Sequence, residues 1–143
     1  EFQAALGSSQ LTKVDYLIKK KQLIAKRYNK YFNEIDYINI PPVRENCYHA
    51  YHLYPLLIDF KKLNLNKSLL MNYFLKNNFR LQVHYKPIHT YKLYKKLFKF
   101  KNNDFPVSLN FFNNEVSIPI FPSLKEDIQD KFISLFGKFL RTK

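Results

Sequence analysis

The first 32 residues constrain the fold most, because they contain no proline and repeat apolar side chains at helical spacing. The apolar stripe runs through Phe2, Leu6, Leu11, Val14, Ile18, Ile24, Tyr28 and Tyr31. A single helix over 2–32 would exceed about 40 Å, which is long for one small domain. Small, uncharged side chains at its start give way to a basic run. We therefore expect a connector that packs on one body first and on another later.

The rest of the chain alternates strand-like and helix-like segments. A short strand is predicted over 34–40, before Pro41–Pro42, and the aromatic run 49–60 is predicted to be the central strand. Pro55 within this run indicates an edge position or a bulge. Asn66 is a candidate N-cap, and Ser123 with Glu126 has the pattern of a capping box. The remaining predictions are helix 66–78, strand 79–85, basic helix 90–98, helix or turn 105–114, strand 115–121 and helix 124–141.

This order predicts an α+β fold with a small, mostly antiparallel sheet and covering helices. We expect two parts. Residues 1–33 are the long connecting helix from a large domain that this chain lacks, and residues 34–143 are a small C-terminal α+β domain. The chain does not begin with methionine, so we expect a cut piece or a processed product.

Composition excludes several classes of protein. The chain has two glycines, so no glycine-rich phosphate loop can be written. A single cysteine, Cys47, excludes an internal disulfide framework and fits a reducing compartment, so we expect a cytoplasmic protein. No apolar run is long enough for a membrane span, and the N-terminus lacks the pattern of a signal peptide.

The net charge of +13 comes mainly from lysine. It reflects either a compositional bias or an anionic partner, such as nucleic acid or a phosphorylated ligand. Sequence-specific readers of nucleic acid favour arginine, which is scarce here. The run 85–101 interleaves aromatics with lysines, as single-strand binders do. Helical spacing places Tyr91, Tyr94, Leu97 and Phe98 on one side, however, which also describes an ordinary amphipathic helix with a solvated lysine face.

The segment RLQVHYKPIH, residues 80–89, concentrates histidine, tyrosine and lysine. A zinc site would combine His84 and His89 with His49 and His52, but the latter two lie at odd spacing on a predicted strand and would face opposite sides. No second cysteine or evident carboxylate completes a tetrahedral set. We therefore predict no metal. The sequence also supplies no nucleophile elbow for a serine triad.

Four blocks in register give this segment another meaning: residues 2–32, HAYHLYPLLID, LQVHYKPIH and SIPIFPSLKEDIQDKF. Together they resemble the C-terminal part of the DegT/StrS-like nucleotide-sugar aminotransferases, over essentially the whole chain. VHYKPIH followed by YKKL is similar to the members that aminate UDP-linked 4-keto-6-deoxy sugars in pseudaminic acid synthesis.

The resemblance implies the fold of a type I aminotransferase, with a large domain that holds pyridoxal phosphate and a small α+β C-terminal domain. It implies a homodimer, a nucleotide-sugar substrate and an amino donor that is usually glutamate. The Schiff-base lysine, the aspartate that pairs with the pyridine nitrogen and an Asn-x-Arg element lie before the QAAL block in the family. The resemblance thus implies no catalytic or cofactor-binding residue in this chain, and an inactive fragment.

The resemblance also implies a substrate-binding set. His84 and Tyr85 would reach the sugar nucleotide, since imidazole and phenol suit sugar hydroxyls and diphosphate oxygens. Lys86 and His89 would assist at the diphosphate, and Arg80 would add charge. Pro87 would fix the turn, as a cis bond. The competing hypothesis is a stand-alone basic binding module for nucleic acid or another polyanion.

Overall fold

The computed structural model describes residues 1–141. A three-stranded antiparallel sheet of order β1-β2-β3 lies at its centre. The strands are β1 (Ile38–Asn39), β2 (Tyr54–Ile58) and β3 (Glu115–Ile118). The helices are α1 (Phe2–Leu11), α2 (Val14–Phe32), α3 (Lys67–Lys76), α4 (Lys92–Phe98), α5 (Pro106–Asn114) and α6 (Glu126–Arg141), with 3-10 turns η1 (Ile88–Thr90) and η2 (Asn102–Asp104). The predicted α+β fold is confirmed.

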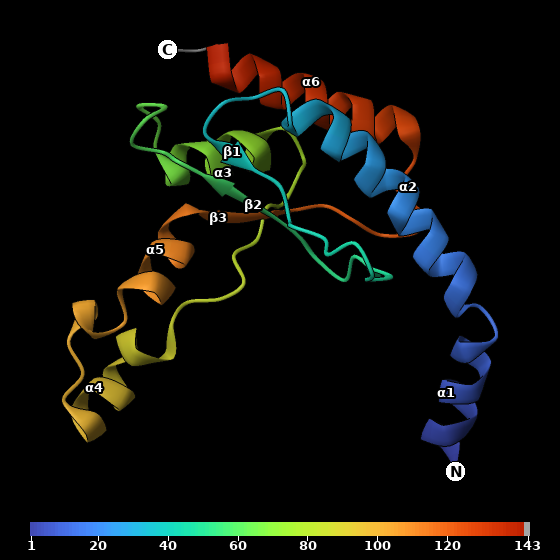
Figure 1. The fold of residues 1–143 in the computed structure, drawn as a ribbon, viewed down its shortest axis with the longest axis horizontal. Helices are drawn as coiled ribbons and strands as arrows, with labels where there is room; N and C mark the ends of the chain where they lie inside the picture. The colour runs from blue at the N-terminus through green and yellow to red at the C-terminus, as the bar shows by residue number, and fades with distance from the viewer. Residues whose placement is uncertain (142–143) are drawn as a thin grey trace.

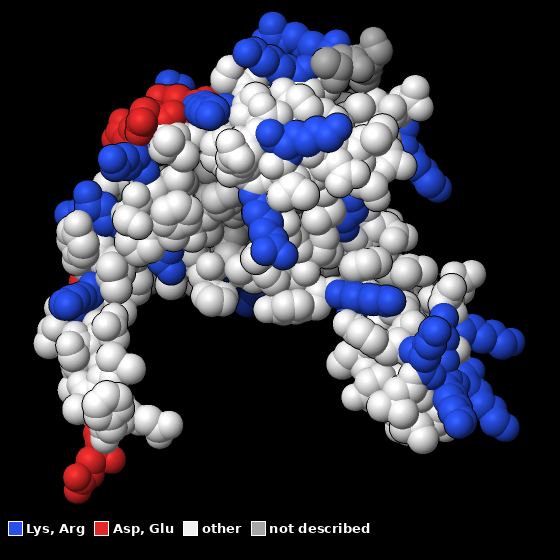
Figure 2. All heavy atoms as spheres, turned by 180° about the vertical axis from the view of Figure 1, so that it is seen from behind, with Lys and Arg blue, Asp and Glu red and all other residues white. Residues whose placement is uncertain are grey.

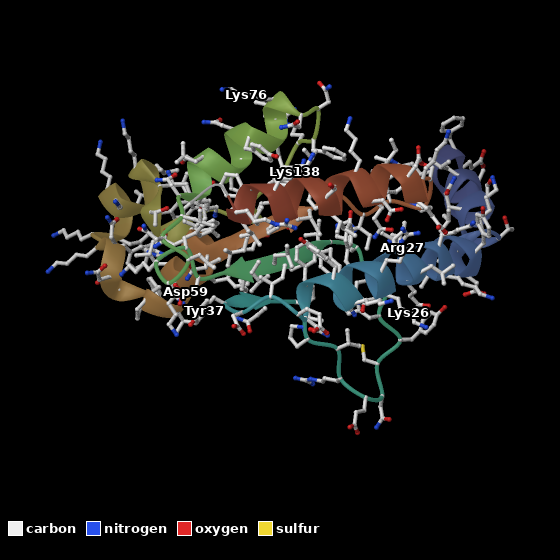
Figure 3. The ribbon with its side chains drawn as sticks, turned by 90° about the horizontal axis from the view of Figure 1, so that it is seen from above. Lys26, Arg27, Tyr37, Asp59, Lys76 and Lys138 are labelled. Atoms are coloured by element: carbon white, nitrogen blue, oxygen red, sulfur yellow. The ribbon has the colours of Figure 1, made fainter. Side chains whose placement is uncertain are left out.

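The elements form an arch (Figure 1). The sheet lies beneath α6 and the upper part of α2, while α1 descends on one side and α4 with α5 descends on the other. Seen from above, α3, α6 and α2 lie beside one another over the sheet (Figure 3). Arg27 of α2 binds Glu126 and Asp130 of α6, which ties two helices that are about a hundred residues apart in sequence.

Aromatic side chains fill the core between the sheet and these helices. The alternate residues Tyr54, Leu56 and Ile58 of β2 are buried and face the helices. Phe132 of α6 stacks on Phe74 of α3 with ring centroids 4.6 Å apart, and Tyr28 of α2 meets the same ring edge-on at 5.9 Å. One aromatic cluster therefore holds all three helices to the sheet.

The N-terminal helix is interrupted, contrary to the prediction of a single helix over 2–32. α1 ends at Leu11, and α2 begins at Val14. The Thr12 hydroxyl donates to the Ser9 carbonyl oxygen at 2.8 Å. Threonine side chains compete in this way with the backbone hydrogen bonds of a helix. All residues of α1 are exposed, whereas α2 buries Ile24, Ala25, Tyr28 and Phe32.

Two strand predictions are too long. The strands predicted over 34–40 and 49–60 contract to Ile38–Asn39 and Tyr54–Ile58. β2 is the central strand, as predicted, although it contains Pro55. The short β1 pairs only with Leu57 and Ile58, so no β1 residue lies opposite Pro55. At Pro55 the central strand thus has the free flank of an edge strand, which a residue without an N–H tolerates.

Two helix-end predictions need correction, and one is accurate. Asn66 caps α3 as predicted, since its side-chain oxygen accepts hydrogen bonds from the backbone N–H groups of Ser68 and Leu69. α6 begins at Glu126 rather than at 124, so Ser123 lies before the cap position and the predicted capping box is wrong. α4 buries no residue, so its apolar side is as exposed as its lysine side.

Candidate functional site

The segment 79–85 meets β3 at one point only, contrary to its prediction as a strand. Gln82 and Ser117 exchange two backbone hydrogen bonds, of 3.1 and 2.8 Å. The next pair of such a ladder would join His84 to Glu115. Instead, the His84 backbone N–H donates to the side-chain Oε2 of Glu115 at 2.9 Å. The carboxylate takes the place of a backbone carbonyl and ends the strand.

A buried polar cluster results beside His84. Glu115 and Ser117 alternate on β3, so both lie on the sheet face opposite the aromatic core. The Ser117 hydroxyl donates to Oε1 of Glu115 at 2.5 Å, and its Oγ lies 2.8 Å from Nδ1 of His84. Glu115 is fully buried and Ser117 nearly so. Three side chains from two distant segments are therefore joined in one hydrogen-bonded chain.

Lys67 at the start of α3 belongs to the same neighbourhood. Its Nζ donates to the Phe112 carbonyl oxygen at 2.5 Å. Burial lowers the pKa of this half-buried lysine, and the charge of Glu115 opposes that shift. The buried carboxylate thus has a cation near it as well as two hydrogen-bond donors.

A cavity of about 430 Å³ opens beside this cluster. Arg80, Gln82 and His84 line it from one segment, and Ser117 and His52 line it from two others. A guanidinium and imidazoles can bind anionic oxygens and hydroxyls. Two of the five predicted substrate-binding residues, Arg80 and His84, therefore share one cavity.

The other three predicted residues lie elsewhere. Tyr85, Lys86 and His89 line a second cavity of about 440 Å³, next to Phe100 and Phe105. The peptide bond between His84 and Tyr85 is cis, and the chain passes from one cavity to the other at this bond. The bond before Pro87 is not among the cis bonds, so the predicted cis proline is wrong.

These three residues differ in accessibility. Tyr85 is 72% exposed, and the Lys86 Nζ lies over the Tyr91 ring, 5.1 Å from its centroid. His89 is buried, and its Nε2 lies 3.1 Å from the Asn102 carbonyl oxygen. Its ring also packs against Phe105. Tyr85 and Lys86 are thus free to meet a ligand, whereas His89 joins η1 to η2.

The remaining histidines lie before the central strand. His49 and His52 precede β2, so the expectation that they face opposite sides of a strand is wrong. His49 accepts at Nδ1 from the Tyr51 backbone N–H, and its carbonyl oxygen accepts from the Gln22 amide. Cys47 is exposed. Within residues 1–141, no three histidine, cysteine or acidic side chains gather closely enough to hold a metal ion.

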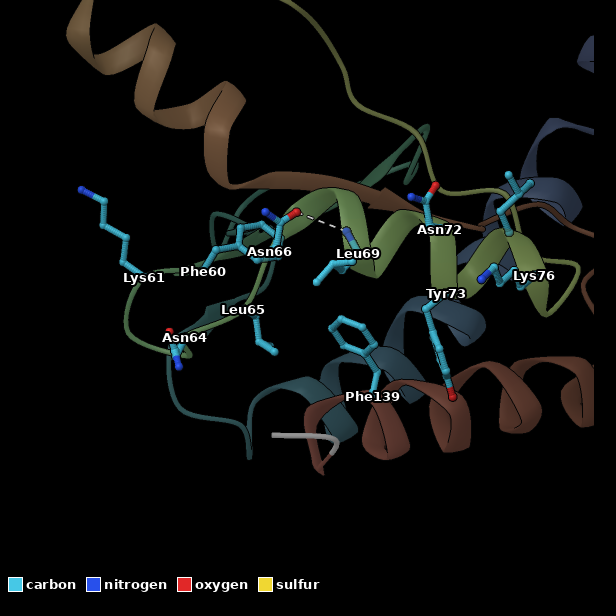
Figure 4. Close-up of a pocket in the computed structure, with 11 residues that line it drawn as sticks. Phe60, Lys61, Asn64, Leu65, Asn66, Leu69, Asn72, Tyr73, Lys76 and Phe139 are labelled. Atoms are coloured by element: carbon cyan, nitrogen blue, oxygen red, sulfur yellow. Dashed lines mark hydrogen bonds between the residues drawn. The ribbon is translucent and has the colours of Figure 1, made fainter.

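A larger cavity, of about 1140 Å³, lies between α3, the turn before it and Phe139 of α6 (Figure 4). Its walls are leucines, asparagines and aromatics, with Lys61 and Lys76 among the lining residues. The hydrogen bond drawn in it is the helix cap from Asn66 to Leu69. No histidine or acidic residue of the described chain lines it. It therefore offers less chemistry than the His84 cavity.

Positive charge is concentrated away from the inner side of the arch. Figure 2 shows lysines and arginines clustered over the leg that carries α4 and over the top of the molecule, while the hollow between the legs is mostly white. On α4 the lysines adjoin exposed apolar side chains, among them Leu93, Leu97 and Phe98. No helix within the described range is long and apolar enough to cross a membrane.

Comparison with known proteins identifies the fold. The model of the DegT/DnrJ/EryC1/StrS aminotransferase family matches residues 1–136. The chain belongs to this family. The small α+β domain described above is therefore an aminotransferase domain, as the four sequence blocks indicate.

The relatives include sugar-modifying proteins. The chain is 36% identical to the spore coat polysaccharide biosynthesis protein SpsC of Bacillus subtilis, over 93% of this chain and 34% of SpsC. It is 34% identical to the UDP-4-amino-4,6-dideoxy-N-acetyl-beta-L-altrosamine transaminase of Helicobacter pylori, over 97% of this chain and 36% of that protein. The predicted similarity to UDP-amino-sugar transaminases is confirmed. The chain spans about a third of the length of these relatives.

Solved structures agree with this assignment. Helicobacter pylori PseC, an aminotransferase involved in the biosynthesis of pseudoaminic acid, superposes with a TM-score of 0.87 at 29% identity, over 99% of this chain and 37% of PseC. The putative sugar aminotransferase Spr1654 from Streptococcus pneumoniae, in its PLP-form, gives 0.82 at 26% identity, over 96% of this chain and 34% of Spr1654.

The described residues do not themselves fit pyridoxal phosphate. An internal imine requires a lysine with a free amine. No lysine within residues 1–141 lines the His84 cavity. The half-buried Lys67 donates to a backbone carbonyl and interacts with Glu115 instead. No step through the cofactor is therefore derived from these residues.

Sequence reasoning missed Glu115, Ser117 and the position of His52. The strand predicted over 115–121 did place Glu115 and Ser117 on one face, because strand residues two apart share a face. A charged residue inside an otherwise apolar strand is the signal that could have drawn attention to Glu115. The identity of its partner, His84, depends on a contact across 31 residues that periodicity does not give.

Proposed function

We propose that this chain is the C-terminal part of a nucleotide-sugar aminotransferase. The complete enzyme would use pyridoxal phosphate to transfer an amino group, usually from glutamate, to a nucleotide-linked keto-sugar. The observation that carries this proposal is the likeness to PseC over nearly the whole chain, together with the family match. Residues 1–33 would then connect to a large domain, and residues 34–143 would form the small domain. We also propose a cytoplasmic homodimer.

Substrate binding is assigned to the predicted set, with roles that follow its two locations. Arg80 supplies a permanent charge for the diphosphate, because guanidinium pairs with phosphate oxygens in a bidentate way. His84 lines the same cavity and contacts the sugar part. Tyr85 and Lys86 bind from the neighbouring cavity, where both side chains are accessible. His89 supports them by holding η1 in place.

The chain alone is proposed to be inactive. Transamination needs a lysine that forms the imine and moves the proton between substrate and cofactor. In the family this lysine lies in the large domain. We expect residues 1–143 to show no amination of a UDP-linked keto-sugar above background, even with pyridoxal phosphate and glutamate added.

The first test is to read the coding sequence upstream of Glu1. The proposal requires that the reading frame continue into an Asn-x-Arg element and, further back, into a strand that ends in the Schiff-base lysine. A start codon at or near Glu1, with no such domain before it, would overturn the proposal.

The second test uses the polypeptide encoded by that longer frame. Arg80→Ala and His84→Ala should each raise KM for the UDP-linked keto-sugar by roughly ten- to a hundredfold, the effect of one lost charge-assisted or polar contact. The matched control is Lys95→Ala with Lys96→Ala on α4, which should leave kcat/KM nearly unchanged. The reverse pattern would refute the substrate role of the His84 cavity.

One observation favours a second function, polyanion binding by α4. This helix buries no residue and carries lysines beside exposed rings. In that case residues 1–143 would bind single-stranded nucleic acid, with an affinity that falls steeply as salt rises. Lys95→Ala with Lys96→Ala would then weaken binding, and His84→Ala would not. Absence of binding at about 0.1 M salt would eliminate this function.

A further inference from the structure

We propose that Glu115 and Ser117 act as a positioning relay, which holds the His84 imidazole with its proton on Nδ1 and leaves Nε2 to accept a hydrogen bond from a hydroxyl of the sugar. This inference rests on the proposed function, because it assigns a part of the sugar nucleotide to His84. The relay itself concerns only residues of this chain, so it can be tested separately.

Counting protons in the cluster fixes the direction of each hydrogen bond. The Ser117 hydroxyl has one proton, and an ionised carboxylate has none. At 2.5 Å from Oε1 of Glu115, the hydroxyl donates to the carboxylate. Its oxygen can then only accept from Nδ1 of His84, 2.8 Å away. When the ring is neutral, the proton lies on Nδ1 and Nε2 carries a lone pair.

The surroundings of Glu115 favour its anionic form. Its two carboxylate oxygens receive separate donors, the Ser117 hydroxyl and the His84 backbone N–H. The ammonium group of Lys67 is close enough to interact with it electrostatically. A fully buried carboxylate requires this kind of compensation, because burial without partners would be costly.

The relay holds both the main chain and the ring of His84. One oxygen of Glu115 fixes the backbone N–H, and the other reaches the imidazole through Ser117. Ring orientation and tautomer are therefore set by the same buried group. No partner for Nε2 is found within residues 1–141, and His84 lines the cavity.

The order of these groups excludes Ser117 as a nucleophile. In a serine triad the hydroxyl donates to histidine, and the carboxylate orients the opposite ring nitrogen. Here the serine stands between the other two groups and donates to the carboxylate. Ser117 is also nearly inaccessible. The cluster positions a ligand-binding group and performs no bond-breaking step.

The relay gives the cavity a chemical preference. A lone pair at Nε2 attracts hydroxyl or amide N–H donors and repels the oxygens of a phosphate, which carry negative charge. Arg80, in the same cavity, has the opposite preference. The sugar hydroxyls are thus assigned to His84 and the diphosphate to Arg80, which divides a role that the sequence alone leaves open.

The test is long-range ¹H–¹⁵N correlation NMR on residues 1–143 labelled with ¹⁵N-histidine, at a pH where the rings are neutral. His84 should show a protonated Nδ1 and an unprotonated Nε2. Ser117→Ala should shift the population toward the Nε2–H tautomer, and Ser117→Thr, which keeps the hydroxyl, should restore the original pattern. Ser134→Ala, at an exposed serine of α6, is the matched control and should change nothing.

The wild-type spectrum alone can overturn the relay, whether or not the variants fold: an Nε2–H tautomer for His84 would do so. An unchanged tautomer in a folded Ser117→Ala variant would also overturn it.

Titration with UDP-N-acetylglucosamine then tests the ligand assignment. We expect the Nε2 resonance of His84 to move, and the affinity to fall roughly tenfold in Ser117→Ala, since one hydrogen bond is lost. UDP, which lacks the sugar, should leave Nε2 unmoved. If UDP moves it equally, the sugar assignment fails. An Nδ1–H tautomer with no response to either probe would refute the proposed binding role of His84 and leave the relay intact. A response to the sugar nucleotide with the wrong tautomer would do the reverse.

Discussion

Replacing Phe132 with alanine tests whether the aromatic cluster holds this domain together. The Phe132 side chain is 1% exposed and contacts three other rings, stacking on Phe74 at 4.6 Å and meeting Tyr28 and Phe79 edge-on at 5.9 and 5.3 Å. Truncation of a buried phenylalanine costs about 3–5 kcal/mol, and ring pairs add about 0.5–1.5 kcal/mol each. With several rings affected, we expect a loss of about 4 kcal/mol in the free energy of unfolding.

The assay is urea unfolding of residues 1–143, followed by circular dichroism. With an m-value of about 2 kcal/mol/M, the midpoint should fall by about 2 M at constant m. If Phe132→Ala does not fold, Phe132→Leu should still lose roughly 1.5 kcal/mol. Phe2→Ala is the matched control and should cost under about 0.5 kcal/mol, because this ring is 89% exposed.

A double-mutant cycle isolates the stacked pair. Leucine at both 74 and 132 should cost less than the sum of the single changes by about 1 kcal/mol, because each single change already removes the stacking. A loss below about 1.5 kcal/mol for Phe132→Ala, or strict additivity of the pair, would refute the reasoning. Either result would mean that α3 and α6 are held by other contacts.

Two further predictions concern tyrosines. Burial raises the pKa of the Tyr28 and Tyr54 phenols above 10.0, so above about pH 10 the unfolded chain releases protons that the folded chain keeps. The free energy of unfolding should therefore fall as pH rises from about 10, and Tyr28→Phe should reduce the slope of urea midpoints against pH; an unchanged slope would contradict the argument. Gly137→Ala should fail to stabilise α6, because a Cβ there would lie 2.8 Å from the Tyr31 hydroxyl oxygen. In a Tyr31→Phe background the same change should add about 1 kcal/mol in urea unfolding, the usual helix preference for alanine over glycine; a full gain without Tyr31→Phe would show that the phenol yields freely.

The fold class could be predicted from sequence because its signals are local. The helical spacing before Phe32, the cap at Asn66 and the apolar face of α6 all depend on residues within a turn or two of one another. Strand lengths were predicted less well. A run of aromatic residues does not show where its neighbour ends, and here the two-residue β1 limits the ladder.

The site was predicted only in part for the same reason. The segment 80–89 was recognisable, but its division at the His84–Tyr85 bond into two cavities follows from the tertiary fold. The end of the ladder at Glu115 likewise requires a side chain to replace a backbone acceptor. Such an exchange leaves no mark in hydrophobic periodicity.

The complete exposure of α1 has a consequence for local stability. A ten-residue helix is marginal in water unless something covers one of its faces. We therefore expect the amide protons of α1 to exchange with solvent quickly, while those of the central strand β2 exchange only on global unfolding. Ordering of α1 would then be coupled to docking against a second body. Protection of its amides would report, residue by residue, the moment at which that body arrives.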